Sequence, residues 1–261
     1  MKQNKKDNQV NWADLLKEAV NKKGILSQAY SAFHDYSLGN QMLAFMQCLE
    51  RDIEVSPINT YNGWKGLNRQ VKKGAKAISL CMPVTRKYKG EDKKTGEEKE
   101  QTYQSFIFKN NWFLLSDTEG DEVPPLKLPE FDVKQALKNL DITEITFEYP
   151  NGNVQGFAAG RDIAVSPIAA LPHKTRFHEI AHVVLGHTVE FKKVDSEKTK
   201  KDIKEVEAES VAYILCSVLG LEGIEYSRGY IQHWLKGQPI PEKSARKIFA
   251  TTDKILKAGI V

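Results

Sequence analysis

The sequence of 261 residues predicts an α+β protein built from two domains. Residues 1–120 would form helices and a β-hairpin, and residues 131–261 would form helices with a small antiparallel sheet. Three observations lead to this class. Apolar residues recur at helical spacing near both ends of the chain, and short alternating runs indicate strands in both halves. The stretch of residues 117–129, which separates the two halves, contains three prolines. We expect a linker at residues 121–130.

The composition is that of an ordinary globular protein. Apolar residues make up 41% of the chain and charged residues 28%. No run of 18 apolar residues occurs, so we expect no membrane span and no membrane partner. The three cysteines are scattered, which argues against a disulfide framework, and the first residues contain no apolar secretory segment. We therefore expect a cytoplasmic protein.

Helices are expected to open the first half. Apolar residues at helical spacing predict one helix over residues 10–20 and another over residues 38–51. Residues 60–76 are expected to form a short helix that ends at Gly74. Three apolar side chains of this segment would face inward: Trp64, Leu67 and Val71.

A long hairpin is expected to follow. Residues 77–84 alternate between apolar and polar side chains as a strand does, and residues 103–115 would form the return strand. The charged residues 91–101 would form the tip, with a turn at Thr95-Gly96.

The region from Val55 to Gly90 is strongly basic, because it has eight basic residues and no acidic one. Such a charge distribution suits a phosphate backbone, and aromatic side chains within it could stack on unpaired bases. A basic surface around one core tryptophan is the alternative. We predict binding of single-stranded DNA through these residues: Trp64, Lys65, Arg69, Lys72, Lys73, Lys76, Arg86 and Lys87.

The second half alternates between helices and short strands. A helix is expected at residues 133–140, followed by strands at residues 145–149, 154–158 and 162–166. A charged loop would occupy residues 191–204. Three further helices are expected at residues 202–220, 226–235 and 241–256.

The motif H-E-x-x-H occupies residues 178–182. Residues four apart share one face of an α-helix, so His178 and His182 could bind one Zn²⁺ together. Glu179 beside them would be the general base that takes a proton from an attacking water molecule. Chance, or two core histidines around an ion pair, can produce the same pattern.

A third metal ligand is expected from the next helix. A glutamate ligand there would make the site that of a gluzincin, a zinc peptidase with two histidines and a glutamate. Glu205 is the favoured ligand, and Glu209 would accept a hydrogen bond from a ligand histidine and so fix its tautomer. Glu207 points about 200° away from Glu205 around the helix and is the fallback. His187 is a weaker candidate, because the pattern with three histidines requires the third one residue later. Pairing of these acids with nearby lysines on the surface is the alternative.

Hydrolysis would also need a donor to the developing oxyanion. The sequence offers four candidates without a choice among them: Tyr213, Tyr226, Tyr230 and His233.

With both halves considered, the chain resembles the ArdC-like antirestriction proteins of mobile genetic elements. The resemblance covers nearly the whole length. In the first half it rests on residues 39–41, 61–64, 71–76, 106–115 and 118–120. In the second half it rests on residues 178–182, 205–209 and 230–235, and this half is also similar to the ImmA/IrrE metallopeptidases.

The resemblance implies a single-stranded-DNA-binding domain followed by a zincin-like metallopeptidase domain with Zn²⁺ as its metal. It implies antirestriction as the role, with DNA and a protein substrate, either a repressor or a restriction component, as partners. Two rival functions follow from the same residues. One is a non-enzymatic DNA-protecting protein whose zincin domain is structural, and the other is an ImmA-like protease specific for a repressor.

Overall fold

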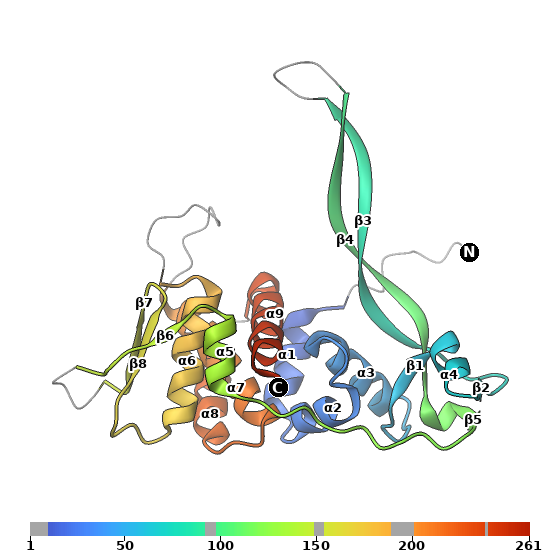
Figure 1. Ribbon diagram of the computed structural model, residues 1–261, viewed down its shortest axis with the longest axis horizontal. Helices are drawn as coiled ribbons and strands as arrows, with labels where there is room; N and C mark the ends of the chain where they lie inside the picture. Colours follow the sequence, from blue (N-terminus) through green and yellow to red (C-terminus); the bar gives the residue numbers. More distant parts are fainter. Residues whose placement is uncertain (1–9, 92–97, 149–153, 189–200, 238–239) are drawn as a thin grey trace. The chain divides into compact units, whose positions relative to one another are not determined.

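The computed structural model describes residues 10–91, 98–148, 154–188, 201–237 and 240–261. It confirms the α+β class, with helices and antiparallel strands in the first half and a mainly helical second half (Figure 1). Two compact units are present. Unit 1 comprises Met1–Met42 and Lys127–Val261, and unit 2 comprises Leu43–Leu126.

The compact units divide the chain differently from the domains expected at residues 1–120 and 131–261. The N-terminal helices belong to unit 1, because α1 (Trp12–Asn21) packs against α8 (Ile224–Gly237) and α9 (Glu242–Gly259). The expected domain boundaries stay a prediction about parts that fold independently.

Helix α7 (Lys201–Val218) is the centre of unit 1. It packs against α8 and α9, against α2 (Ile25–Phe33) and against α6 (Pro172–Leu185). Its residues 206–216 are buried on every side, which is typical of a helix surrounded by others. The buried apolar residues include Val206, Ala208, Val211, Ala212, Ile214 and Leu215.

Two features of the N-terminal helices have causes in local sequence. Asn11 caps α1 by accepting from the backbone N–H groups of Ala13 and Asp14. Helix α2, which the sequence did not predict, follows directly after Gly24, whose φ of 83° allows the reversal between α1 and α2.

Helix α3 (Leu38–Glu50) begins where the Asp253 carboxylate of α9 accepts from the backbone N–H of Leu38 at 2.7 Å.

The sheet of unit 1 has three short strands in the order β6-β8-β7. Strands β7 (Gly156–Ala159) and β8 (Asp162–Val165) are antiparallel, as expected, but β6 (Thr143–Glu144) runs parallel to β8. The expected small antiparallel sheet is thus present as the pair of β7 and β8, to which β6 adds a parallel strand. The chain enters β6 from α5 (Val133–Asn139) on the side of β8 opposite to β7. Helix α6 packs on β7 and β8.

Unit 2 is dominated by a long hairpin of β3 (Ile78–Glu91) and β4 (Glu98–Leu114), which confirms the hairpin prediction (Figure 1). Strand β1 (Ile58–Thr60) pairs with the other edge of β4. The expected tip at residues 91–101 falls largely outside the described residues, as do most residues of the expected loop at 191–204.

The helix expected over residues 60–76 is much shorter. Thr60 caps α4 (Tyr61–Gly66), and Asn68 then adopts a positive φ of 54°, which reverses the chain. Strand β2 (Arg69–Val71) follows and pairs with β5 (Thr118–Gly120), which comes after a short 3₁₀ turn at Leu115–Asp117. Val71 is thus a strand residue, and the helix prediction beyond Gly66 was wrong.

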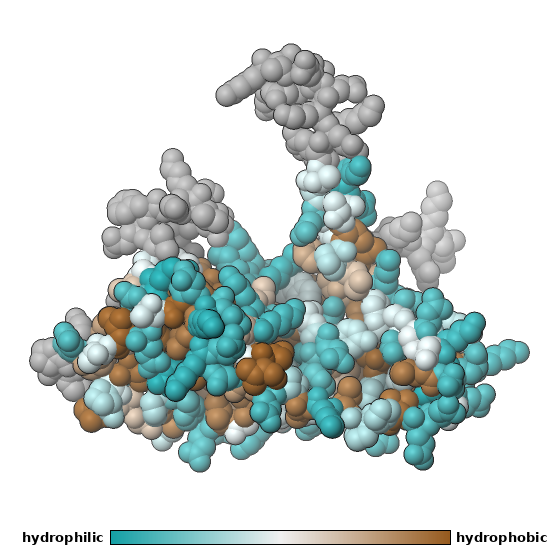
Figure 2. Space-filling view, viewed as in Figure 1, coloured by the Kyte–Doolittle hydropathy of each residue, from teal (hydrophilic) through white to brown (hydrophobic). Residues whose placement is uncertain are grey.

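Hydrophilic side chains cover much of the visible surface, with separate hydrophobic patches between them (Figure 2). Among the described residues, no helix combines the length and apolarity that crossing a membrane requires.

Candidate metal centre

Helix α6 carries both histidines of the motif on one face. It begins at Pro172 and ends at Gly186, whose φ of 77° lets the chain leave the helix. His178 and His182 are partly exposed, whereas Glu179 between them is buried. Their ring Nε2 atoms are 3.1 Å apart.

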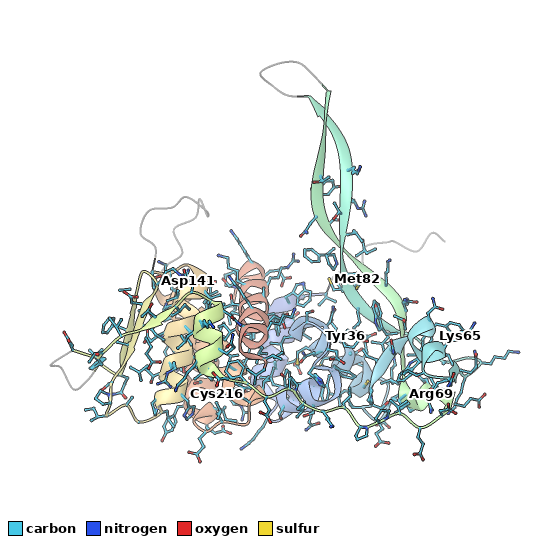
Figure 3. The ribbon with its side chains drawn as sticks, in the orientation of Figure 1. Tyr36, Lys65, Arg69, Met82, Asp141 and Cys216 are labelled. Atoms are coloured by element: carbon cyan, nitrogen blue, oxygen red, sulfur yellow. The ribbon has the colours of Figure 1, made fainter. Side chains whose placement is uncertain are left out.

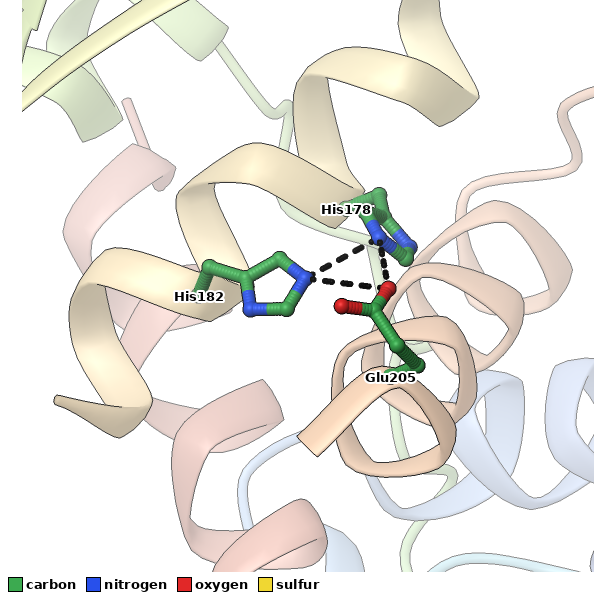
Figure 4. Close-up of side chains that lie close together, drawn as sticks. All are labelled: His178, His182 and Glu205. Carbon is green, nitrogen blue, oxygen red and sulfur yellow. Dashed lines mark hydrogen bonds and ion pairs between the residues drawn. The ribbon is translucent and has the colours of Figure 1, made fainter. Parts of the chain in front are cut away.

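Glu205 reaches the same point from α7 (Figure 4). Its Oε2 lies 3.4 Å from His178 Nε2 and 3.5 Å from His182 Nε2. Among the described residues, these three side chains are the group that could hold a metal ion. A tetrahedral ion with ligands at about 2.0–2.1 Å separates its ligand atoms by about 3.3 Å, which is close to the observed triangle.

The hydrogen bonds of the two Nδ1 atoms leave both Nε2 atoms directed at Glu205, where a metal could bind. His178 Nδ1 lies 3.0 Å from Glu209 Oε2 and donates to this carboxylate. His182 Nδ1 lies 3.0 Å from His187 Nδ1. If both Nδ1 atoms carry hydrogen, two neutral rings direct lone pairs at each other, and a cation between them removes the repulsion. The residues therefore fit a divalent metal.

The pKa shifts at the site favour the charged forms of His178, Glu205 and Glu209. Burial alone would lower the pKa of His178, but hydrogen bonds to Glu205 and Glu209 outweigh it and raise the pKa to about 9. Hydrogen bonds from both histidines lower the pKa of Glu205. Burial opposes ionisation of Glu209, yet His178 and Lys174 together lower its pKa, and Lys174 Nζ lies 2.7 Å from Glu209 Oε1.

Glu179 occupies a confined position beside the histidines. Burial raises its pKa, and the neighbouring histidines oppose that shift only in part. Strand β7 approaches it closely at Gly156, where an added Cβ would lie 3.1 Å from Glu179 Oε1 and 2.6 Å from Thr175 Cγ2. The site therefore requires glycine at this point of β7.

The two weaker ligand candidates are paired with each other. His187 Nε2 lies 2.9 Å from Glu207 Oε2, and neither side chain belongs to the triangle of His178, His182 and Glu205. Glu207 leaves α7 in another direction than Glu205, as the helical wheel predicted. Burial lowers the pKa of His187, and the hydrogen bond to Glu207 opposes this shift. The sequence offered one signal for the pair, a histidine directly after the glycine that ends α6.

The candidate oxyanion donors differ in exposure. Tyr213 is buried within α7, whereas Tyr226, Tyr230 and His233 are exposed on α8.

Two of the predicted DNA-binding residues have internal roles in unit 2. The Trp64 ring is only 2% exposed and its Nε1 donates to the carbonyl of Phe113, so it is a core residue and cannot stack on a base as it stands. Arg69, which Figure 3 labels, donates to Thr118 Oγ1 at 2.7 Å and to the carbonyls of Thr118, Gly120 and Asp121. The hydrogen bonds of its guanidinium thus join β2 to β5.

The other predicted cations lie on the surface. Lys72 donates to the carbonyl of Ser116 at 3.0 Å and is still exposed. The remaining exposed residues are Lys65, Lys73, Lys76, Arg86 and Lys87. Tyr61, an aromatic residue of the basic region, is exposed as stacking on a base requires. Sequence reasoning missed two further exposed aromatic side chains, Tyr103 and Phe106.

Comparison with known proteins agrees with this architecture. Residues 3–112 match the family described as the N-terminal domain of anti-restriction factor ArdC. The metal-free crystal structure of antirestriction protein ArdC from plasmid R388 is similar over 95% of this chain and 93% of that chain, with a TM-score of 0.55 and 21% identity. A search of curated proteins gave no significant match.

The fold and the triangle of side chains thus define an α+β protein with a candidate metal centre. Residues 3–112 match the ArdC N-terminal domain, and the chain has the fold of the R388 ArdC protein, which confirms the resemblance found in the sequence. The Mn(II)-bound structure of the same R388 protein is also similar, with a TM-score of 0.52, 19% identity, and coverage of 95% of this chain and 96% of that chain.

Proposed function

We propose that this protein is a metal-dependent peptidase of the gluzincin type that also binds single-stranded DNA and acts in antirestriction for a mobile genetic element. The observation that carries the metal part is the convergence of His178 Nε2, His182 Nε2 and Glu205 Oε2 within 3.1–3.5 Å of one another. Two histidines with one carboxylate are a donor set that suits Zn²⁺. That the R388 protein has been solved with Mn(II) makes manganese the natural second ion to test.

Hydrolysis would use the side chains as follows. His178, His182 and Glu205 would hold a divalent ion, which would supply the charge that polarises a peptide carbonyl and makes water a better nucleophile. Glu179 takes the proton from the attacking water and delivers it to the leaving amine, for which a raised pKa is suitable. Glu209 holds His178 in the orientation that directs Nε2 at the metal. A repressor or a restriction component is the proposed substrate.

The DNA part of the proposal rests on unit 2. Its exposed cations would contact phosphates, and exposed aromatic rings would stack on bases in place of the buried Trp64. The proposed phosphate contacts are Lys65, Lys72, Lys73, Lys76, Arg86 and Lys87. Arg69 is left out because the carbonyls around it already accept its hydrogens.

The experiment that tests the enzyme is the variant Glu179→Gln, with the exposed Glu119→Gln as its matched control. Purified proteins are loaded with Zn²⁺ or Mn²⁺, their metal content is measured, and they are incubated with candidate repressors and restriction components. We expect Glu179→Gln to keep its metal and lose cleavage by at least about 100-fold. Antirestriction activity that survives in Glu179→Gln would instead favour the non-enzymatic DNA-protecting function. Cleavage of a repressor alone would favour the repressor-specific protease.

The experiment that tests DNA binding compares salt dependence. Neutralising several phosphates makes affinity fall steeply as salt rises. We expect the triple variant Lys72→Glu, Lys73→Glu and Lys76→Glu to bind a single-stranded oligonucleotide weakly and with a smaller salt slope. A matched triple variant reverses three exposed lysines of unit 1: Lys134, Lys138 and Lys254. Equal loss in both triple variants would show only a general charge effect.

A further inference from the structure

Glu207 is a carboxylate in an unusual setting, because only 1% of its surface is exposed. A buried carboxylate is costly unless hydrogen-bond donors surround it. Two donors face it: His187 Nε2, at 2.9 Å from Glu207 Oε2, and the Ser244 hydroxyl of α9. Glu207 is therefore fixed as a hydrogen-bond acceptor, directly behind the metal triangle.

His187 is held against His182 by the end of α6. Its backbone N–H donates to the carbonyl of His182 at 2.9 Å, and Gly186 supplies the left-handed conformation that this turn requires. The ring of His187 then packs against the ring of His182, with the two Nδ1 atoms 3.0 Å apart. Each ring thus has one nitrogen directed at the other.

The direction of these hydrogen bonds follows from the last acceptor. Since the Glu207 carboxylate can only accept, His187 Nε2 carries the hydrogen. A neutral His187 then has its lone pair on Nδ1 and must accept from His182. A neutral His182 in turn carries its hydrogen on Nδ1, so its lone pair lies on Nε2, the atom of the triangle.

We propose that Glu207 and His187 form a positioning relay that fixes the tautomer of His182 and presents its Nε2 to the metal. The relay rests on the metal-binding part of the proposed function. It differs from the support of His178, where Glu209 accepts from Nδ1 directly. His182 is reached in two steps, because His187 lies between the carboxylate and the ligand ring.

The direct test is the tautomer of His182 in the metal-free full-length protein, from two-bond ¹H–¹⁵N correlation spectra of its histidines. We expect hydrogen on Nδ1 of His182 and on Nε2 of His187. In Glu207→Leu the anchor is lost, and the His182 signal should move toward the Nε2–H form. Glu207→Gln keeps an oxygen that can accept from His187 and should keep the original tautomers.

Metal affinity gives a second readout. Loss of a group that supports a ligand typically weakens metal binding about 10- to 100-fold. We expect this loss for Zn²⁺ in Glu207→Leu, measured by competition with a chromophoric chelator, and a change below about threefold in Glu207→Gln. The exposed Glu119→Leu is the control for the loss of one carboxylate.

A double variant keeps the test valid if Glu207→Leu does not fold. His187→Leu combined with Glu207→Met replaces both partners with apolar groups, a change that buried pairs often tolerate. Wild-type tautomer and Zn²⁺ affinity in either variant would overturn the relay. Wild-type protein that binds no metal would refute the proposed function instead, and the tautomer spectra would still decide on the relay.

Discussion

Lys174 Nζ lies 2.7 Å from Glu209 Oε1, while the other oxygen of the same carboxylate lies 3.0 Å from His178 Nδ1. One buried carboxylate thus links the cation Lys174 at the start of α6 to the ring of the candidate ligand His178 one turn later. The lysine side chain is 21% exposed and the glutamate side chain 9% exposed, so both are largely removed from water. The lysine offsets the charge that orients the ring.

Removal of Lys174 should therefore destabilise the fold and loosen the site. Breaking a pair that is mostly buried costs about 1–3 kcal/mol, somewhat less than for a fully buried pair. We expect Lys174→Met to lower the free energy of unfolding by this amount in chemical denaturation. The double variant Lys174→Met, Glu209→Met should recover most of the stability and still bind Zn²⁺ more weakly than wild type. Equal stability of the single and double variants would contradict this account.

Gly156→Ala should damage catalysis more than metal binding. The added Cβ would lie 2.6 Å from Thr175 Cγ2 and 3.1 Å from Glu179 Oε1, so β7 or the Glu179 side chain must move. A displacement of this size at a general base can cost about 100-fold in rate. We expect cleavage to fall while Zn²⁺ affinity changes less than about threefold. Gly229→Ala is the control, because nothing lies within 4 Å of the added Cβ.

Asp253 should make stability depend on pH. Burial raises its pKa to about 6, although the Leu38 N–H and Lys257 oppose the shift. The folded protein thus keeps this proton up to about pH 6, whereas the unfolded chain releases it near the ordinary value of about 3.9. Stability from this group is present below the lower pKa and is lost as the pH rises through the higher one.

The variant Asp253→Asn tests that sign. It keeps an oxygen that can accept from the Leu38 N–H but has no charge to bury. We expect it to be about 1–2 kcal/mol more stable than wild type at pH 7.5, and the advantage to vanish near pH 4. The exposed Asp162→Asn should show no comparable trend. A variant that is less stable than wild type at every pH would mean that the charged hydrogen bond outweighs burial.

Trp64 and Phe106 should respond in opposite ways. Trp64 is buried, so Trp64→Ala should lower the free energy of unfolding by about 3–5 kcal/mol. Phe106 on β4 is 62% exposed, so Phe106→Ala should leave stability nearly unchanged. If it stacks on a base, its loss should weaken single-stranded DNA binding by about 1–3 kcal/mol. Denaturation and oligonucleotide titration of both variants would check the contrast.

The grouping of His178, His182 and Glu205 was largely predictable, because the spacing of the two histidines is a local property of the chain. The spacing of His178 and His182 alone places both on one face of α6, and the acidic stretch at residues 205–209 offered the carboxylate that the structure brings to them. The pairing of His187 with Glu207 was not predictable, since it depends on how Gly186 turns the chain and on how α7 docks.

The basic region illustrates the opposite case. The charge and the aromatic content of residues 55–90 tell which side chains are present, but they do not tell which way each side chain points. The Trp64 ring points inward, where its Nε1 donates to a carbonyl of β4. The Arg69 side chain points toward β5, where its guanidinium donates to three carbonyls. Such contacts join residues about 50 positions apart, and periodicity in a single sequence does not report them. The parallel pairing of β6 has a similar origin, since it depends on the position of β8.

Three carboxylates of α7 leave the helix within about one turn and contact four side chains of α6 and the turn that follows it. Glu205 reaches both histidines, Glu207 reaches His187, and Glu209 reaches His178 and Lys174. A rotation or a one-residue slip of α7 against α6 would break all of these contacts together. We therefore expect no stable state in which only some of these contacts between α6 and α7 are formed. We expect the packing of α7 against α6 and the binding of a metal to be cooperative. A chelator should then loosen the contact between these two helices as well as remove the ion.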